Sequence, residues 1–278
     1  MYLTAERLAL ANKEVRETFE RTSIAWQSIP HWETGDPGAT KVRGDSATAI
    51  QPPTPSNPGP FFTPSLTLDP RDVQVNVTLA QASAPNPDAL LATVTSHTVE
   101  LARTVDDVVL KLLYTKVQAA GLSITPAAAP VITPQELLDQ LIPARAKLED
   151  AGYRAPSVLL TNTAGLLTLS QFVSGYSVLD SLLAAANANS LHRATTIDGT
   201  AANKDKVRIL LLGRRNLIAH GRAADASPGE EPVDIAVGVP PSLAVVGETN
   251  TGGMELVVRI SFATRIKDVS GIVAVKGP

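Results

Sequence analysis

The sequence predicts an α+β fold in which short, mixed strands surround one long helix. Apolar residues keep a spacing of three and four over residues 88–120, which predicts a helix about 48 Å long. Residues 69–79 and 254–262 alternate with period two, as strands with one buried face do. Regular helices do not separate the strands, so the repeated βαβ pattern of a parallel sheet is not expected.

Composition narrows the class of protein. The 278 residues are 44% hydrophobic, enough for a real core, and their net charge is −3, so the chain as a whole offers no basic surface for nucleic acid. Cysteine is absent, which excludes disulfides, thiolate zinc sites and cysteine nucleophiles. No run of about eighteen apolar residues exists, and the charged N-terminal residues do not fit a secretory signal. We expect a cytosolic protein or a particle assembled in the cytosol.

Residues 4–27 are predicted to form an amphipathic helix. Thr4 suits the N-cap position, apolar residues from Leu8 to Trp26 recur at three- and four-residue intervals, and Pro30 ends the pattern. The apolar stripe has two interpretations. It docks on the helix's own domain, or it belongs to a terminal arm that docks on a neighbouring molecule.

The next segment is rich in proline and poor in charge. Residues 30–87 hold eleven of the twenty-one prolines, and residues 46–68 carry no charged residue, reading SATAIQPPTPSNPGPFFTPSLTL. Proline fixes φ and lacks a backbone N–H, which excludes helix and central strand. A loop of this length indicates a binding loop or a linker, but a disordered linker would be charged and would lack Phe61 and Phe62. We infer that the loop packs on another molecule, which points to an assembly protein.

The elements that follow are predicted in order. Residues 69–79 form a strand that pairs with residues 65–68 in a hairpin or ribbon. The long helix over residues 88–120 ends at Gly121, and its charged residues, Asp106 among them, are expected in solvent.

The second half of the chain continues with helices and short strands. Thr133 and Glu136 form a capping box for a helix over residues 134–151. A short buried strand, a helix and two final strands are predicted at residues 157–160, 163–169, 254–262 and 271–275.

The sequence contains no recognisable catalytic, cofactor-binding or metal-binding motif. The phosphate-binding, dinucleotide-binding and GxSxG motifs are absent, and the histidines have no metal-ligand spacing. The basic residues Arg214, Arg215 and Arg222 are expected in a solvated loop. We therefore predict no catalytic, cofactor-binding or metal residue and no cofactor. The enzyme alternative is a hydrolase assembled from scattered His and Asp, which requires a convergent pocket with perturbed pKa values.

Two stretches resemble a known family. LLDQLIPARAKLEDAGYRAPSVLLTNTAGLLTL (residues 137–169) and VDIAVGVPPSLAVVGETNTGGMELVVRISFATRIKDVSGIVAV (residues 233–275) are similar to passages in the HK97-type major capsid proteins of tailed phages and in the related encapsulins. The resemblance implies four parts. They are an N-terminal arm (1–43), an extended loop (44–86), a peripheral domain with a long spine helix (87–121 and 251–278) and an axial domain (122–250).

The resemblance also implies the function. It predicts a structural protein, not an enzyme, that assembles as pentamers and hexamers into an icosahedral shell around phage double-stranded DNA, without sequence specificity. Portal, scaffold or cementing proteins are the other implied partners, and no membrane is. The expected location is the virion capsid, assembled in the bacterial host cytoplasm. The chain begins almost at the N-arm, so no fused scaffold segment is expected. The alternative within the fold is an encapsulin-type shell.

The same resemblance predicts which residues touch neighbouring subunits and how the shell is held. Six residues are expected to be buried between subunits: Trp26, Phe61, Phe62, Val73, Val75 and Val77. The extended loop contains no lysine, so we expect no isopeptide crosslink through it.

Overall fold

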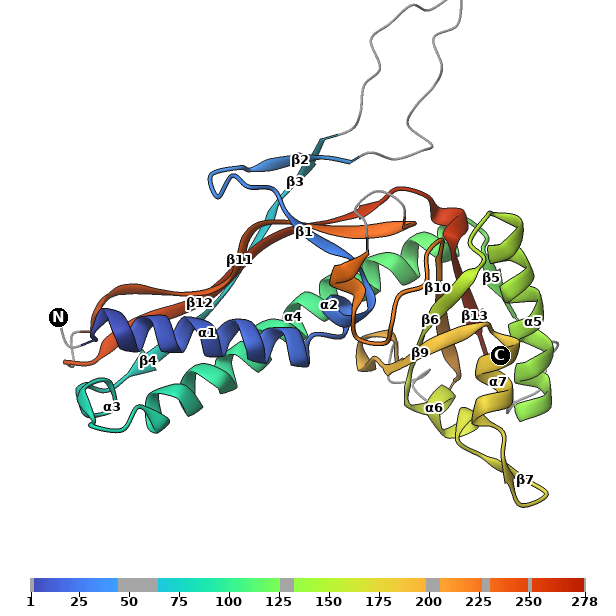
Figure 1. The fold of residues 1–278 in the computed structure, drawn as a ribbon, viewed down its shortest axis with the longest axis horizontal. Helices are drawn as coiled ribbons and strands as arrows, with labels where there is room; N and C mark the ends of the chain where they lie inside the picture. Colours follow the sequence, from blue (N-terminus) through green and yellow to red (C-terminus); the bar gives the residue numbers. More distant parts are fainter. Residues whose placement is uncertain are drawn as a thin grey trace, which may run out of the picture.

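A computed structural model of the chain describes residues 3–44, 65–125, 133–198, 206–226, 231–249 and 252–277. Two sheets lie at opposite ends of the molecule, and one long helix, α4 (Asp88–Ala119), runs from one to the other (Figure 1). Gly121 follows the C-cap of α4 with a φ of 70°, the left-handed conformation that commonly ends a helix. The helix has the length that the sequence predicts.

The N-terminal pattern forms two helices where one was expected. Thr4 accepts a hydrogen bond from Arg7 N and begins α1 (Ala5–Thr22). At Ser23 the chain turns, and the Ser23 side chain caps α2 (Ile24–Ser28). The buried face of α1 packs on α4 and on strand β11. The helix therefore docks on its own domain, the first of the two interpretations.

The first sheet has four strands in the order β1-β11-β12-β4. Its alternating residues Val75, Val77, Leu256 and Val258 are buried against α4 and α1, as period-two patterning predicts. Only β1 and β11 are parallel. The strands are β1 (His31–Glu33), β11 (Val233–Glu248), β12 (Met254–Ile266) and β4 (Asp69–Val77).

The second sheet has five strands, and helices cover both of its faces. Ile209 and Leu211 of β10 pack towards α5 and α7, whereas Leu210 and Leu212 pack into the core that α4 shares, which explains the unbroken apolar runs in these strands. The strand order is β5 (Ser123–Ile124), β13 (Ile272–Lys276), β10 (Arg208–Arg214), β6 (Ala155–Thr161) and β9 (Ala188–Arg193). The helices of this part of the chain are α5 (Pro134–Asp150), α6 (Thr163–Leu169) and α7 (Leu179–Ala185).

Two small two-stranded units leave the body of the molecule. One is the ribbon β2–β3, and the other is the hairpin β7–β8 (Figure 1). β3 pairs with β2, and β4 pairs with β12, so the expected pairing of residues 65–68 with the following strand is wrong. The remaining elements are β2 (Lys41–Arg43), β3 (Ser65–Thr67), α3 (Leu79–Ser83), β7 (Phe172–Val173), β8 (Tyr176–Ser177) and the 3-10 turns Thr195–Ile197, Ala223–Asp225 and Val269–Gly271.

The sheets do not follow the expected domain boundaries. β11 was placed in the axial domain (122–250), but it pairs along its length with β12 in the first sheet. β13 was placed with the peripheral segment (251–278), but it pairs with β10 in the second sheet. The reason is that β11 and β12 pair directly with each other in the first sheet, whereas β13 pairs with β10 in the second sheet. Among the residues described, no helix is both long and apolar enough to cross a bilayer.

Candidate assembly surfaces

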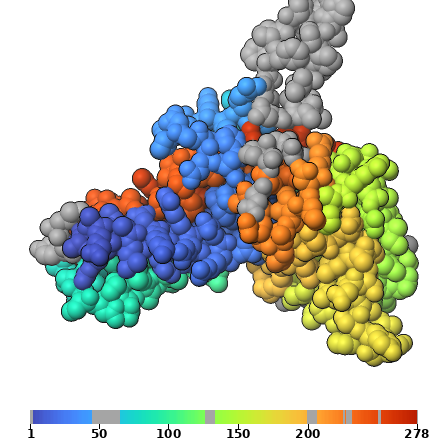
Figure 2. Space-filling model, in the orientation of Figure 1, coloured from blue at the N-terminus to red at the C-terminus, as the bar shows by residue number. Residues whose placement is uncertain are grey.

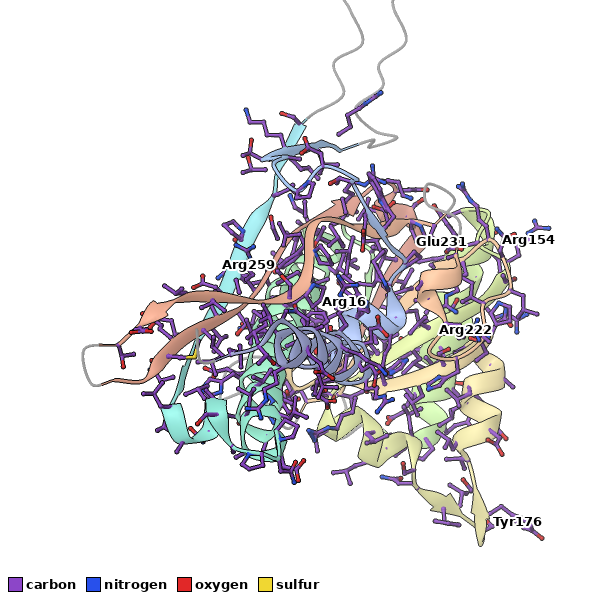
Figure 3. All side chains as sticks on the ribbon, turned by 60° about the vertical axis from the view of Figure 1, so that its left-hand side comes forward. Arg16, Arg154, Tyr176, Arg222, Glu231 and Arg259 are labelled. Atoms are coloured by element: carbon purple, nitrogen blue, oxygen red, sulfur yellow. The ribbon has the colours of Figure 1, made fainter. Side chains whose placement is uncertain are left out.

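The hairpin β7–β8 carries the clearest uncovered apolar surface. Ser174 and Gly175 both have positive φ, 53° and 84°, the geometry of a tight two-residue hairpin turn. The flanking side chains are exposed: Phe172 by 73%, Val173 by 49% and Tyr176 by 79%. Figure 2 shows this part of the chain projecting freely, and Figure 3 labels Tyr176 at its tip. A cluster of exposed large apolar residues marks an interaction site.

Sequence reasoning missed this surface. The signal that could have found it is the pair Ser174-Gly175 between aromatic residues, which is typical of a hairpin turn. Leu167, on the neighbouring helix α6, is also 66% exposed.

A buried ion cluster anchors the base of the ribbon β2–β3. Arg265 of β12 donates two hydrogen bonds to the Asp234 carboxylate, at 2.6 and 2.7 Å, and Lys267 donates a third at 2.9 Å. Arg265 also donates to the backbone oxygen of Arg43 at 3.1 Å, and its guanidinium lies 4.6 Å from the ring centre of Trp32. The Arg265 side chain thus joins β12 of the first sheet to β1 of the same sheet and to strand β2 of the ribbon.

The electrostatics of this cluster favour the charged state. Burial alone would raise the pKa of Asp234, but hydrogen bonds from Arg265 and Lys267 outweigh it and hold the pKa below its usual value. The carboxylate side chain is fully buried and the two cations nearly so. Bidentate contact with a guanidinium fixes geometry as well as charge.

The N-terminal helices are held to their own subunit by polar contacts as well as by packing. The Asn12 amide accepts a hydrogen bond from Leu243 N at 2.8 Å and donates one to Leu243 O at 3.3 Å. The Asn12 side chain therefore hydrogen-bonds backbone groups on the edge of β11 that the short strand β1 does not reach. Arg7 donates to the backbone oxygens of Ala82 and Ala84.

Three of the six predicted contact residues are already buried within one chain. Trp26 is 7% exposed, Val75 is fully buried and Val77 is 2% exposed, because α1, α2 and α4 cover them. The prediction that they are buried between subunits and not within one is thereby corrected. Val73 is half-buried, and Phe61 and Phe62 lie outside the residues that the structure describes.

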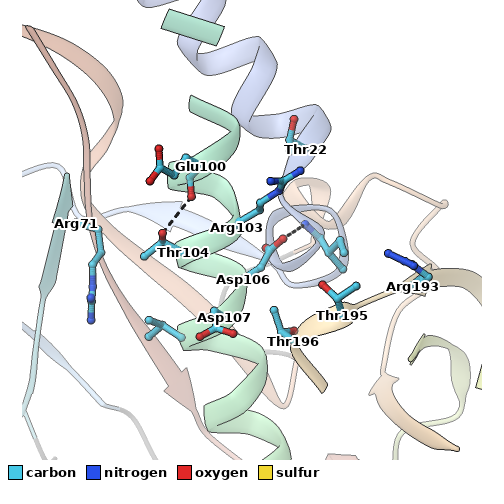
Figure 4. Close-up of a pocket in the computed structure, with 12 residues that line it drawn as sticks. Thr22, Arg71, Glu100, Arg103, Thr104, Asp106, Asp107, Arg193, Thr195 and Thr196 are labelled. Atoms are coloured by element: carbon cyan, nitrogen blue, oxygen red, sulfur yellow. Dashed lines mark hydrogen bonds between the residues drawn. The ribbon is translucent and has the colours of Figure 1, made fainter. Parts of the chain in front are cut away.

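An open pocket beside α4 has a volume of about 620 Å³. Figure 4 shows Asp106 between α4 and the N-terminal helices. Its carboxylate accepts hydrogen bonds from Ser23 Oγ at 2.7 Å and from the backbone N–H groups of Ile24 and Ala25 at 3.0 and 2.9 Å. Asp106, expected in solvent, is therefore a buried cap of α2.

Burial raises the pKa of Asp106 to about 6, against the opposing effect of its three hydrogen bonds. A raised pKa in a pocket is the feature that the hydrolase alternative requires. In this chain the Asp106 carboxylate already accepts three hydrogen bonds from the N-terminus of α2. The perturbed pKa therefore has a structural cause.

Other sequence candidates lie apart from this cavity. Arg214, expected in a solvated loop, is buried and donates to Ile218 O at 3.1 Å. Arg215 is exposed and lies 4.7 Å from the ring centre of Tyr153. His192 and His220 stack with ring centres 4.8 Å apart, a contact that the sequence did not predict. Across the described part of the chain, no three His, Asp or Glu side chains gather as metal ligands would.

Solved structures identify the fold. A phage-related protein from Bordetella bronchiseptica RB50 matches with a TM-score of 0.66 over 96% of each chain, at 10% identity. The virus-like particle from Pyrococcus furiosus matches with a TM-score of 0.64 over 98% of this chain and 100% of its own, at 15% identity. The SrpI encapsulin from Synechococcus elongatus PCC 7942 matches with a TM-score of 0.58 over 91% and 87%, at 11% identity. Chains from Mycobacterium phages Bobi and Cain also match, at 13% and 14% identity.

No family model matches the sequence. No curated protein matches it either. The solved structures nevertheless cover nearly the whole chain, and they confirm the predicted fold. The chain has the HK97-type fold, the fold of phage capsid subunits and encapsulin shells.

Proposed function

We propose that this chain is a structural shell subunit, the major capsid protein of a tailed phage, and that its shell encloses double-stranded DNA. The observation that carries the proposal is the match to the virus-like particle from Pyrococcus furiosus, which spans 98% of this chain and 100% of that one.

The uncovered surfaces support assembly. The hairpin β7–β8 exposes aromatic residues that one subunit cannot cover. In a head-to-tail ring every copy meets the next through the same two surfaces, and the rotation between copies closes pentamers and hexamers. We place the axial domain on the five-stranded sheet with its helices, and the peripheral domain on the four-stranded sheet with α4 and α1.

The contents of the shell distinguish the two candidate functions. The match to the SrpI encapsulin favours the alternative, a protein compartment of a bacterial cell. A phage capsid assembles in the host cytoplasm, receives DNA through a portal and works with scaffold or cementing proteins. An encapsulin encloses a protein.

Electron microscopy of the purified recombinant chain tests the proposal. We expect closed particles or rings of five and six subunits. A species that sediments as a monomer at micromolar concentration, with no particles, would contradict the shell function. If the recombinant chain forms particles, a second experiment uses particles isolated from the natural source. These are treated with nuclease and then opened. Protected DNA supports the phage capsid, whereas a co-purifying enzyme without DNA supports the encapsulin.

A further inference from the structure

The loop that follows β10 covers part of β9, the last strand of the second sheet. This covering loop, residues 215–222, is fastened through one backbone group. The Ile218 carbonyl oxygen accepts hydrogen bonds from the Asn189 amide at 2.8 Å and from the Arg214 guanidinium at 3.1 Å. The Ile218 side chain is buried, whereas that of Leu217, the residue before it, is 77% exposed. Asn189 belongs to β9 and Arg214 to β10, so the contacts fasten the loop to two strands.

Two histidine rings lie parallel where the covering loop meets β9. His192 of β9 and His220 of the loop have ring centres 4.8 Å apart and ring planes 9° apart. His192 is 8% exposed, and its Nε2 atom is shielded from water, with no hydrogen-bond partner among the residues that the structure describes. The closed loop therefore keeps water from an imidazole that can bind a proton.

The surroundings of His192 oppose a positive charge. Burial, which has the largest effect, together with His220 and Arg214, lowers the pKa of His192 from 6.5 to about 4. The Arg214 guanidinium is itself buried and interacts with the Glu231 carboxylate. A proton on His192 in the closed loop would thus place a second buried cation beside Arg214.

The elements that pack around β9 do not offset this charge. α2 and β6 contain no ionisable residue. Asp106 of α4 is turned to the N–H groups at the start of α2, and α7, with Asp180, packs on the opposite face of β9, where Leu191 points. The remaining charged residues of β9 and of the covering loop are all cations: Arg193, Arg215 and Arg222.

We propose that the covering loop is an acid-released latch, which is closed on β9 at neutral pH and opens as His192 takes up a proton. Opening lets water reach the imidazole and separates the new charge from Arg214. Because the open form binds the proton more tightly, acid shifts the equilibrium towards it.

The position of the latch gives its opening a wider effect. The 3-10 turn Ala223–Asp225 follows the loop and packs on α2 and β1, and Figure 3 labels Arg222 between loop and turn. Opening therefore acts where the second sheet meets the N-terminal elements. The inference does not depend on the proposed shell function, since all of these contacts lie within one chain.

Single introduced thiols test the latch, because the chain has no cysteine. The test position is Ile218→Cys, which keeps the backbone oxygen that fastens the loop. Leu217→Cys is the exposed reference, and Leu211→Cys, at a fully buried position of β10, reports unfolding of the whole chain. Each full-length variant, as dissociated subunits, is treated at pH values from 7.5 to 5 with 4,4′-dithiodipyridine, which reacts with thiols in acid as well as at neutral pH.

We expect the rate at Ile218→Cys, relative to Leu217→Cys, to rise as the pH falls. With a pKa of 6.5 in the open loop and about 4 in the closed loop, the ratio of open to closed loop rises about thirtyfold between pH 7.5 and 5. Adding His192→Gln should abolish the rise. Adding His31→Gln is the matched control and should preserve the rise, because burial lowers the pKa of His31 to about 4 as well, but its ring stacks on Trp26 outside the latch.

An equal rise in the His192→Gln background, or no rise in the wild-type background, would overturn the proposal. So would a parallel rise at Leu211→Cys, because acid would then unfold the whole chain. If His192→Gln does not fold, His220→Ala at an exposed position replaces it. Loss of the covering ring should raise the relative rate at Ile218→Cys already at pH 7.5 and reduce its dependence on pH, and an unchanged profile would contradict the latch.

Discussion

At the scale of single residues, Asp234 is the carboxylate that neutralises two buried cations. It is the shared acceptor for Arg265 and Lys267 in a site that excludes water. Removing one member of a buried ion cluster leaves the others uncompensated, which costs more than the cluster contributes when complete.

We predict that Asp234→Asn lowers the free energy of unfolding of the dissociated subunit by about 3–5 kcal/mol, measured by chemical denaturation. The control is Asp107→Asn. Asp107 pairs with Lys111 at 2.6 Å, but both side chains are largely exposed, so we expect a loss of about 0.5 kcal/mol or less. Similar losses in the two variants would contradict the role assigned to Asp234.

Two buried histidines are expected to make the chain sensitive to acid. Burial lowers the pKa of His31 and of His192 from 6.5 to about 4. Between these pH values the unfolded chain binds more protons than the folded chain, so stability falls as the pH falls from 6.5 to 4. Each shift corresponds to roughly 3 kcal/mol at most. Asp106 acts in the opposite direction, because its pKa is raised to about 6 and the folded state gains its proton first.

We predict that the two histidines outweigh Asp106 and that the double variant His31→Gln and His192→Gln loses less stability than the wild type over this range. Denaturation midpoints at pH 7, 5.5 and 4 provide the measurement. A wild-type loss that is unchanged in the double variant would assign the acid sensitivity to other groups.

At the scale of elements, the hairpin β7–β8 contributes little to the stability of its own subunit. Its apolar side chains are exposed, so replacing them changes few intrachain contacts. If they contact a neighbouring copy, the same replacement removes the centre of an interface.

We predict that Phe172→Ser with Tyr176→Ser prevents or strongly reduces particle formation, while the free energy of unfolding changes by about 0.5 kcal/mol or less. Leu217→Ser is the matched control, since Leu217 is 77% exposed in a different loop and should leave assembly intact. Normal assembly of the hairpin variant, seen by electron microscopy, would exclude this surface from the subunit interfaces.

At the scale of the whole molecule, we predict that the proposed shell is held by non-covalent surfaces. Residues 44–86 contain no lysine, and an isopeptide bond needs a lysine amine beside an Asn or Asp side chain. Particles boiled in detergent should therefore give a single band near 29.2 kDa on a denaturing gel. A ladder of larger bands would show that a lysine outside the loop, such as Lys41 or Lys111, reaches a neighbour.

The sequence by itself determined the elements whose signals are local. The length of α4, the capping box of α5 and the alternation in β4 depend on residues close in sequence, and the structure has each of them. The stretches at residues 137–169 and 233–275 also indicated the HK97-type fold by resemblance. Assembly into a shell and the contents of that shell remain predictions.

Only the tertiary structure decided which charged and aromatic residues are buried and which strands share a sheet. Asp106 is buried because α2, distant in sequence, presents its free N–H groups to it. Trp26 is buried because the N-terminal helices fold onto α4, and β13 joins the second sheet because β10 offers an edge there. These contacts join residues many tens of positions apart, and the free energy that selects them comes from packing and hydrogen bonding that no local pattern records.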